Sequence, residues 1–491
     1  MMKIRMIMTM TLMGMALTSL AQKEAVFRNP SMQSFRYNTS QNEVSVGYDY
    51  RHATTPMRLE QGDGHSRAFA HVDAYLHKGK ATLWGEADYS NGSTRNIQFC
   101  ETSDFELLYP YLMADTVGGK SKQEHYHFLG GFSYLVGRRW NIGAEGTYTA
   151  LMEYRTRDPR PKNLTGDLQA KLAASYRLGM ALDSYMLGVA VSGRKYKQTN
   201  EVKLYNEVSV PTIYHLTGLG NDYYRFRGMN TSTYYKGYGI GVMLDWSRVN
   251  QRGWFAHAEY GYLDIDKIIS TLNELPMANI KEYREKVMVG YTTGNERNVF
   301  GYNVSEEWTC RRGRENIFGT AKDNVYPQIS TMAPYMADKA CLSTEVSYRH
   351  IFPSKSEWGI KGNLRYDSWE ESYERPWRDL QEDAWVMGLQ LSGKMVARNW
   401  QILGRLSGEY YMNSVDEFEV ADEDANSTLL TPVEHYRDYL SQDRQMLDAM
   451  VEIGYTKSKF FSPFVRINWQ YAKYLETEHQ NRLMVSMGVK F

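Results

Sequence analysis

The chain has 491 residues, with 57 basic and 57 acidic side chains and a mean hydropathy of −0.55. A neutral chain without a dense basic stripe argues against nucleic acid as a partner. Its three cysteines, Cys100, Cys310 and Cys341, lie far apart and form neither a disulfide framework nor a zinc-site spacing. The abundance of Tyr (38) and Gly (39), with only 13 Pro, favours a protein built of many strands.

The first 21 residues predict a cleaved secretory signal peptide. Lys3 and Arg5 form a short positive region, and residues 6–20 form an apolar run. Ser19 and Ala21 are the small residues expected just before a cleavage site. No later run of about eighteen apolar residues could form a membrane-spanning helix. We therefore expect an exported protein.

Residues 22–42 precede the first predicted strand. We expect this segment to lie in the periplasm or in the lumen of a barrel. It is too short for the plug domain of a TonB-dependent receptor, so the sequence predicts that the chain is not itself such a receptor. It is long enough to act as a small stopper.

From residue 43 onwards, apolar and polar residues alternate in runs of roughly ten, the length of a tilted membrane-spanning strand. Aromatic residues bracket the apolar face, as Tyr238 and Trp246 do, which is the pattern that two membrane interfaces select. The other face carries ionisable groups that a wet lumen tolerates. The clearest runs are residues 44–51, 68–76, 140–150, 238–247, 358–367, 465–471 and 482–491.

Short and long connections are expected to alternate along the chain. The predicted short turns are His77–Lys80, Gly137–Arg139, Asn250–Gly253, Pro353–Glu357, Ala397–Asn399 and Thr456–Lys459. The predicted long polar loops are 53–66, 91–123, 197–234, 267–283, 313–338 and 413–443. This pattern predicts an all-β fold, a transmembrane antiparallel up-and-down β-barrel over residues 43–491, with roughly 18 strands (range 14–18).

The chain ends on an apolar-alternating strand with Phe491 as its last residue. A closed barrel requires this strand to pair with the first one. A terminal aromatic residue on such a strand resembles the signal read by the barrel assembly machinery, so we interpret Phe491 as an assembly signal.

Several segments together carry a resemblance to a known family. They are "SLAQ" at the leader end, "ATLWGEADYSNG" at 81–92, "ETSDFELLYPYLMADTVGG" at 101–119, "YRTRDPRPKN" at 154–163 and the terminal "GVKF". Over nearly the whole mature chain the sequence resembles an uncharacterised family of Bacteroidota outer-membrane β-barrel proteins. The resemblance implies an architecture and a location in the outer membrane. It assigns no activity and no functional residues.

Ten charged residues are expected to face the lumen. Two roles stay open for them: rings of charge that set solute selectivity, or ion-pair networks that stiffen a plugged barrel. The residues are Asp73, Glu86, Asp88, Glu145, Asp245, Glu259, Lys361, Arg365, Asp367 and Arg466.

Two charged clusters are further candidates. The acidic run 416–424 could supply oxygens to a cation, although a solvated loop is the favoured interpretation. Arginines at 311–314 and 155–160 could bind an anionic substrate, although contact with lipid or lipopolysaccharide phosphates is favoured. No nucleotide-binding or hydrolase motif accompanies the scattered histidines, so we expect neither an enzyme nor a cofactor.

Two functions remain as hypotheses. The first is a channel for small solutes, or the barrel of an uptake system. The second is a non-conducting accessory barrel beside a TonB-dependent transporter or another surface complex. The expected partners are outer-membrane lipid, lipopolysaccharide and the barrel assembly machinery.

Overall fold

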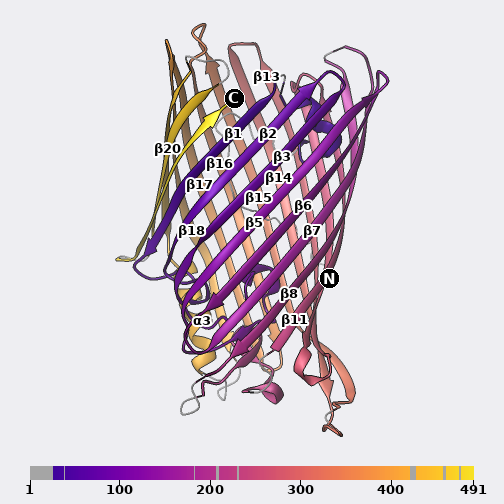
Figure 1. Ribbon diagram of the computed structural model, residues 1–491, viewed down its shortest axis with the longest axis vertical. Helices are drawn as coiled ribbons and strands as arrows, with labels where there is room; N and C mark the ends of the chain where they lie inside the picture. The colour runs from indigo at the N-terminus through magenta and orange to yellow at the C-terminus, as the bar shows by residue number, and fades with distance from the viewer. Residues whose placement is uncertain are drawn as a thin grey trace.

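The computed structural model describes residues 26–37, 39–181, 183–205, 210–228, 232–323, 325–420, 427–456, 461–474 and 477–491. These residues form a closed sheet of 18 antiparallel strands, in which each strand pairs with its neighbours in sequence and the last pairs with the first (Figure 1). The predicted β-barrel and its strand number are confirmed. The predicted signal peptide lies outside the described residues.

The strands of the barrel range from 12 to 24 residues. They are β1 (Gln41–Ala53), β2 (Gly64–Lys78), β3 (Ala81–Ile97), β5 (Gly119–Val136), β6 (Trp140–Arg155), β7 (Arg160–Arg177), β8 (Tyr185–Lys203), β11 (Ser232–Arg248), β12 (Gly253–Ile269), β13 (Leu275–Gly294), β14 (Asn298–Phe318), β15 (Gln328–Ile351), β16 (Glu357–Glu374), β17 (Trp377–Ala397), β18 (Trp400–Val420), β19 (Arg444–Tyr455), β20 (Ser462–Lys473) and β21 (His479–Lys490).

The remaining elements are short. Three strands form a separate small sheet in the order β10-β9-β4. They are β4 (Met113–Ala114), β9 (Tyr214–Gly218) and β10 (Asn221–Asp222); the helices are η1 (Pro30–Phe35), η2 (Leu59–Gln61), α2 (Phe105–Leu108), η3 (Tyr224–Phe226), η4 (Ser270–Leu272) and α3 (Ser427–Leu440). No helix among the described residues has the length and apolarity that a membrane span requires.

The two ends of the barrel differ. At one end, the short-turn end, β2 and β3 are joined by residues 79–80 and β17 and β18 by residues 398–399. The opposite end, the loop end, carries the longer connections 98–118 and 204–231. In Figure 1 the C-terminus lies at the upper, short-turn end and α3 at the lower, loop end. Short turns on one side and long loops on the other are typical of outer-membrane barrels.

The outward face carries a continuous apolar band between two aromatic belts. On β18, for example, Leu406 lies between Trp400 and Tyr410, and all three side chains are exposed. Ring pairs with centroids 4.6–5.1 Å apart mark the short-turn end: Trp140–Tyr176, Tyr185–Trp246, Trp254–Tyr291 and Trp400–Tyr455. The second belt contains Tyr89–Tyr126, Tyr262–Tyr283 and Tyr366–Trp385. Two belts around an aliphatic band match the two interfaces of a bilayer.

Two of the predicted long loops are wrong. Most of 267–283 belongs to β12 and β13, which are joined by residues 270–274 only, and most of 313–338 belongs to β14 and β15. With 24 residues, β15 is about twice as long as a tilted strand needs to cross a bilayer. Beyond the membrane the outer face of such a strand meets water, while its inner face packs against other parts of the chain, as Tyr335 does against Leu219. Its hydrogen-bond ladder continues after the apolar alternation has stopped, so the sequence there reads as a loop.

The barrel closes at the very end of the chain. β21 pairs with β1 from Lys490 opposite Glu43 to Gln480 opposite Ala53. Beyond the last ladder pair, the backbones of Phe491 and Asn42 exchange two hydrogen bonds of 3.1 Å. The role of Phe491 as an assembly signal stays a prediction.

The two faces of β18 give a matched test of the barrel in the membrane. Leu406→Arg places a cation among the acyl chains, and we expect it to destabilise the folded barrel by roughly 2–4 kcal/mol. Ser407→Arg, one residue further on the inner face, is expected to cost less than about 1 kcal/mol, because it lies beside the charged pair Arg405–Asp448. Urea unfolding in detergent or lipid measures both. Equal losses would contradict this assignment of the two faces.

Candidate functional site in the barrel lumen

Residues 26–37, the N-terminal stopper, lie inside the barrel near its short-turn end. Three of its backbone carbonyls accept hydrogen bonds from the wall. Tyr75 Oη donates to Gln33 O at 2.7 Å, Ser175 Oγ to Ser31 O at 3.2 Å, and Gln251 Nε2 to Phe35 O at 2.5 Å. These wall residues come from β2, β7 and the turn after β11. The stopper is therefore fixed from several directions.

Apolar packing and small wall residues complete this contact. Met32 is fully buried in a cluster with Phe255 and Met288 of the wall. A Cβ added to Gly143 would lie 2.5 Å from the backbone of Pro30, and one added to Gly188 would lie 2.7 Å from Met32. Both glycines face the stopper where no larger residue fits. Glycine inside a strand permits this close approach of another segment.

Asp245 faces inward but is not exposed to water in the lumen. Its carboxylate accepts hydrogen bonds from Asn29 Nδ2 of the stopper at 2.9 Å and from His257 Nδ1 at 2.7 Å, and it is 1% exposed. The sequence predicts that Asp245 faces a wet lumen. That interpretation of its environment is wrong, because the N-terminal stopper covers the residue.

A second insertion, the outer stopper, occupies much of the loop end. It consists of residues 98–118 and 210–228, which contain α2 and the small sheet β10-β9-β4. Met113 of β4 pairs with His215 of β9, and both are fully buried. The segment 101–119 was expected in an exposed outer loop. Apolar residues such as Leu108 and Leu112 were the available signal that it is not, since both are 0% exposed.

The wall holds the outer stopper by its backbone. Carbonyls of the stopper accept four hydrogen bonds from long side chains of different strands. These are Tyr235 Oη to Tyr111 O (2.8 Å), Lys267 Nζ to Leu112 O (2.8 Å), Arg311 Nη1 to Tyr109 O (3.0 Å) and Arg378 Nη1 to Leu219 O (2.6 Å). A carbonyl that points at a cation makes a stronger hydrogen bond than a neutral pair does. Both ends of the lumen are thus occupied by parts of the chain itself.

A pocket of about 450 Å³ remains at the loop end, between the wall, residues 57–62 and α3. We call it the outer pocket. Its lining includes five cations, two carboxylates and five aromatic residues. The cations are Arg51, Arg58, Lys339, Arg365 and Arg444, the acids are Asp367 and Glu382, and the aromatic residues are Trp369, Tyr411, Tyr436, Tyr439 and Tyr474. Its size and aromatic lining are those of a small-molecule site.

Cations stack on rings in the outer pocket. The Arg58 guanidinium lies 3.4 Å from the ring centroid of Tyr436, and Lys339 Nζ lies 4.7 Å from that of Trp369. Arg444 pairs with Glu382 at 3.5 Å, but neither Arg51 nor Lys339 has a carboxylate within 4.0 Å among the described residues. The positive charge is therefore only partly neutralised.

Three buried donors in the outer pocket have no hydrogen-bond acceptor among the described residues. They are Trp369 Nε1, Arg51 Nε and Arg444 Nε. A buried donor without an acceptor is costly, and a bound solute or water relieves that cost. None of these residues was singled out from the sequence, because they lie on separate strands and carry no local motif.

All ten predicted lumen residues lie on the face opposite the exposed apolar band, and most of them are paired. Glu145 accepts hydrogen bonds from Lys171 Nζ at 2.8 Å and Trp84 Nε1 at 2.9 Å. The other ion pairs are His71–Asp88, Arg28–Glu259, Lys361–Glu345, Arg365–Asp367 and Arg466–Glu452. Asp73 and Glu86 have no Lys, Arg or His partner within 4.0 Å among the described residues. The pairing favours the ion-pair role for this wall.

The two charged clusters are dispersed. Asp416, Glu417 and Glu419 lie on β18, where Asp416 pairs with Arg437, and residues 421–426 lie outside the described residues. Arg155 is buried and pairs with Asp115 of the outer stopper at 2.6 Å, and Arg311 pairs with Glu282. Contact with lipid phosphate is therefore the wrong interpretation for these two arginines, because the outer stopper covers them.

Glu60 gives the outer stopper a dependence on pH. Burial raises the pKa of its carboxyl to about 7, against the partly opposing charge of Arg58. The buried environment favours the neutral Glu60 carboxyl. The stabilisation that this carboxyl gives to the closed outer stopper is therefore complete at low pH and is lost as pH rises through 7. We expect the free energy of opening of residues 98–118 to fall by about 1 kcal/mol between pH 6 and pH 8.

Hydrogen-exchange protection factors of residues 98–118, corrected for intrinsic exchange rates, measure this change. Glu60→Gln is expected to reduce the pH dependence and to keep more of the protection seen at pH 6, while burial of Glu101, which also raises the pKa of that carboxyl, leaves a residual slope. Protection that stays constant in the native protein, or a slope in Glu60→Gln equal to the native slope, would contradict the role of Glu60.

Comparisons with known proteins find one family model and several solved structures of low similarity. Similar solved structures include the ferric preacinetobactin receptor BauA of Acinetobacter baumannii (10% identity, 92% of this chain and 80% of that chain, TM-score 0.40). Others are the CymD monoaromatic hydrocarbon channel (10%, 97% and 94%, 0.34) and Pseudomonas aeruginosa FpvA bound to a heterologous pyoverdine (9%, 92% and 72%, 0.42). No curated protein sequence matches. The chain belongs to the family of unknown function DUF6850, whose model matches residues 30–491.

Proposed function

We propose that this protein is a gated transport barrel of the outer membrane that takes up a small anionic solute with a planar ring. The outer pocket carries the proposal. Arg51 and Lys339 supply positive charge without a neighbouring carboxylate, and Trp369 and Arg444 supply unpaired donors beside aromatic faces. An anion with a ring satisfies both features, through charge-assisted hydrogen bonds and stacking.

In the proposed cycle the barrel rests closed and opens at the short-turn end. The solute enters the outer pocket, and it leaves when the N-terminal stopper moves. The stopper is held in part by hydrogen bonds, for example from Tyr75 and Gln251, which water replaces when the segment leaves. In the membrane the short-turn end faces the periplasm. A periplasmic partner could therefore reach the segment and pull it.

The paired wall favours a second candidate, a non-conducting accessory barrel. In ion pairs such as Arg466–Glu452 and Arg405–Asp448, each wall charge is neutralised by its partner and attracts a permeating ion less strongly. A barrel stiffened in this way and stoppered at both ends would serve a neighbouring transporter as a scaffold. The remaining partners, namely membrane lipid, lipopolysaccharide and an assembly machinery that reads Phe491, stay predictions under both proposals.

Conductance across a planar bilayer separates the two proposals. We compare the mature chain with a variant lacking residues 26–37, both checked for folding by heat-modifiable mobility. The gated barrel predicts stable conducting steps for the variant and only rare openings for the intact chain. Absence of conducting steps from a folded variant would contradict the gated barrel and favour the scaffold.

The charge of the outer pocket predicts the selectivity of the opened variant. Lys339→Gln in the variant lacking 26–37 is expected to lower the chloride-to-potassium permeability ratio, because wall charge sets the local ion concentration. Lys355→Gln is the matched control, since Lys355 is exposed in the short turn 352–356. An unchanged ratio in Lys339→Gln would exclude the outer pocket from the path.

A further inference from the structure

An excess of negative charge lies on the inner wall between the two stoppers. Two rows of facing residues cross β1, β2, β3 and β5. In one row Glu43, Asp73 and Glu86 are direct neighbours, and in the other His71, Asp88 and His127 are. Like charges placed directly opposite on adjacent strands are destabilising. Three adjacent carboxylates in one row break that rule.

The described cations neutralise only one side of this group. Glu43 pairs with Arg466 at 3.1 Å and lies 3.8 Å from Lys490. Arg36, at the end of the N-terminal stopper, acts on Asp73 from a distance. Glu86 has no Lys, Arg or His partner within 4.0 Å among the described residues, and it lies beside Asp88 on the same strand face. Within 4.0 Å, the imidazole of His71 is therefore the only cationic partner that the described residues offer to the pair Glu86 and Asp88.

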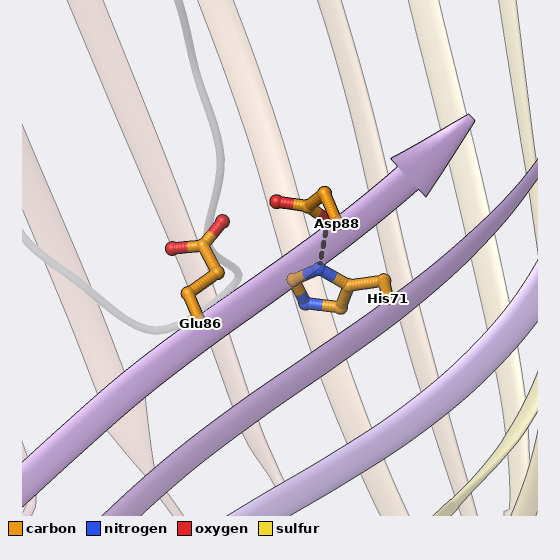
Figure 2. Close-up of side chains that lie close together, drawn as sticks. All are labelled: His71, Glu86 and Asp88. Carbon is orange, nitrogen blue, oxygen red and sulfur yellow. Dashed lines mark hydrogen bonds and ion pairs between the residues drawn. The ribbon is translucent and has the colours of Figure 1, made fainter. Parts of the chain in front are cut away.

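Three side chains on this side converge in the way that metal ligands do. Figure 2 shows His71, Glu86 and Asp88 on the same side of two neighbouring strands, with a dashed line joining His71 and Asp88. One ligand atom from each residue lies within 4.8 Å of the other two. Ligand atoms around a first-row metal ion lie about 3–4.4 Å apart, given bonds of about 2.0–2.2 Å. Small side-chain rotations are enough to bring the ligand atoms from 4.8 Å to these distances.

The cluster is also accessible and supported. All three residues are half-buried, with His71 28% and Asp88 31% exposed at the side chain. His71 Nδ1 lies 2.6 Å from Asp88 Oδ1, so an imidazole nitrogen and a carboxylate oxygen already face each other, as two ligand atoms of one ion do. Asp73, directly opposite Glu86, is the nearest further oxygen donor in the ladder.

We propose that His71, Glu86 and Asp88 bind one divalent transition-metal ion in the lumen. A mixed imidazole and carboxylate set suits Zn²⁺, Fe²⁺ or Mn²⁺, whereas Ca²⁺ and Mg²⁺ prefer all-oxygen sites. The ion supplies the missing positive charge between the stoppers. The site is independent of whether the barrel conducts, since it requires only that water and ions reach the lumen.

Zinc titration of the mature chain tests this site. The protein is purified in detergent without a polyhistidine tag, stripped with chelator, and titrated with Zn²⁺ by calorimetry. We expect one Zn²⁺ per chain, and affinity at least about tenfold weaker in Glu86→Gln and in His71→Ala. Calcium at millimolar concentration is expected to leave Zn²⁺ bound. His350→Ala, whose ring bonds Asn298 on β14, is the matched histidine control and should bind as the native chain does.

Two titration results would overturn the proposal. One is the absence of stoichiometric Zn²⁺ binding to the native chain, which needs no variant. The other is native affinity in both Glu86→Gln and His71→Ala. Visible absorption of the Co²⁺-loaded native chain gives a second readout that does not depend on how a variant folds. A spectrum identical to that of Co²⁺ in buffer would also contradict the site.

Discussion

The structure depends on one constraint: within the bilayer, every backbone N–H and C=O must find its partner in the protein. The 18 strands meet it by a continuous ladder, and the pairing of β21 with β1 removes the last open edge. Closure separates two faces with different solvents. The outward face becomes an apolar band between aromatic belts, and the inward face encloses a space that only water or the chain itself can fill.

The chain fills much of that space. The N-terminal stopper and the outer stopper are held by long polar side chains such as Tyr75, Lys267 and Arg311, which donate to backbone carbonyls. This arrangement satisfies the backbone of irregular segments at a depth where few waters are available. The lumen space that the stoppers leave is lined largely by charged residues. The outer pocket is rich in cations, and the His71–Glu86–Asp88 group is rich in carboxylates, so these two sites differ in the charge they attract.

The barrel could be predicted from the sequence because alternation and aromatic brackets are local. The long strands beyond the membrane could not, since the outer faces of β14 and β15 meet water there and lose their apolar pattern, while their inner faces pack against the outer stopper. Alternation also assigns a residue such as Asp245 to one face without telling whether another segment covers it. The outer pocket joins Arg51 of β1 to Arg444 of β19 and Tyr436 of α3. Only closure of the barrel brings such distant residues together, and no spacing in the sequence records it.

The central claim is that the N-terminal stopper occupies the lumen, and a disulfide tests it most directly. Ser34 Oγ lies 2.8 Å from Ser133 Oγ of β5, and the three native cysteines are buried and unpaired. Cells that express Ser34→Cys/Ser133→Cys are oxidised, and the cross-linked peptide is quantified by mass spectrometry. The account predicts a near-complete 34–133 disulfide, and none for Ser34→Cys/Ser407→Cys, in which the second cysteine is on β18 across the barrel. Absence of the 34–133 disulfide, or equal yields from the two pairs, would contradict a stopper bound at this place.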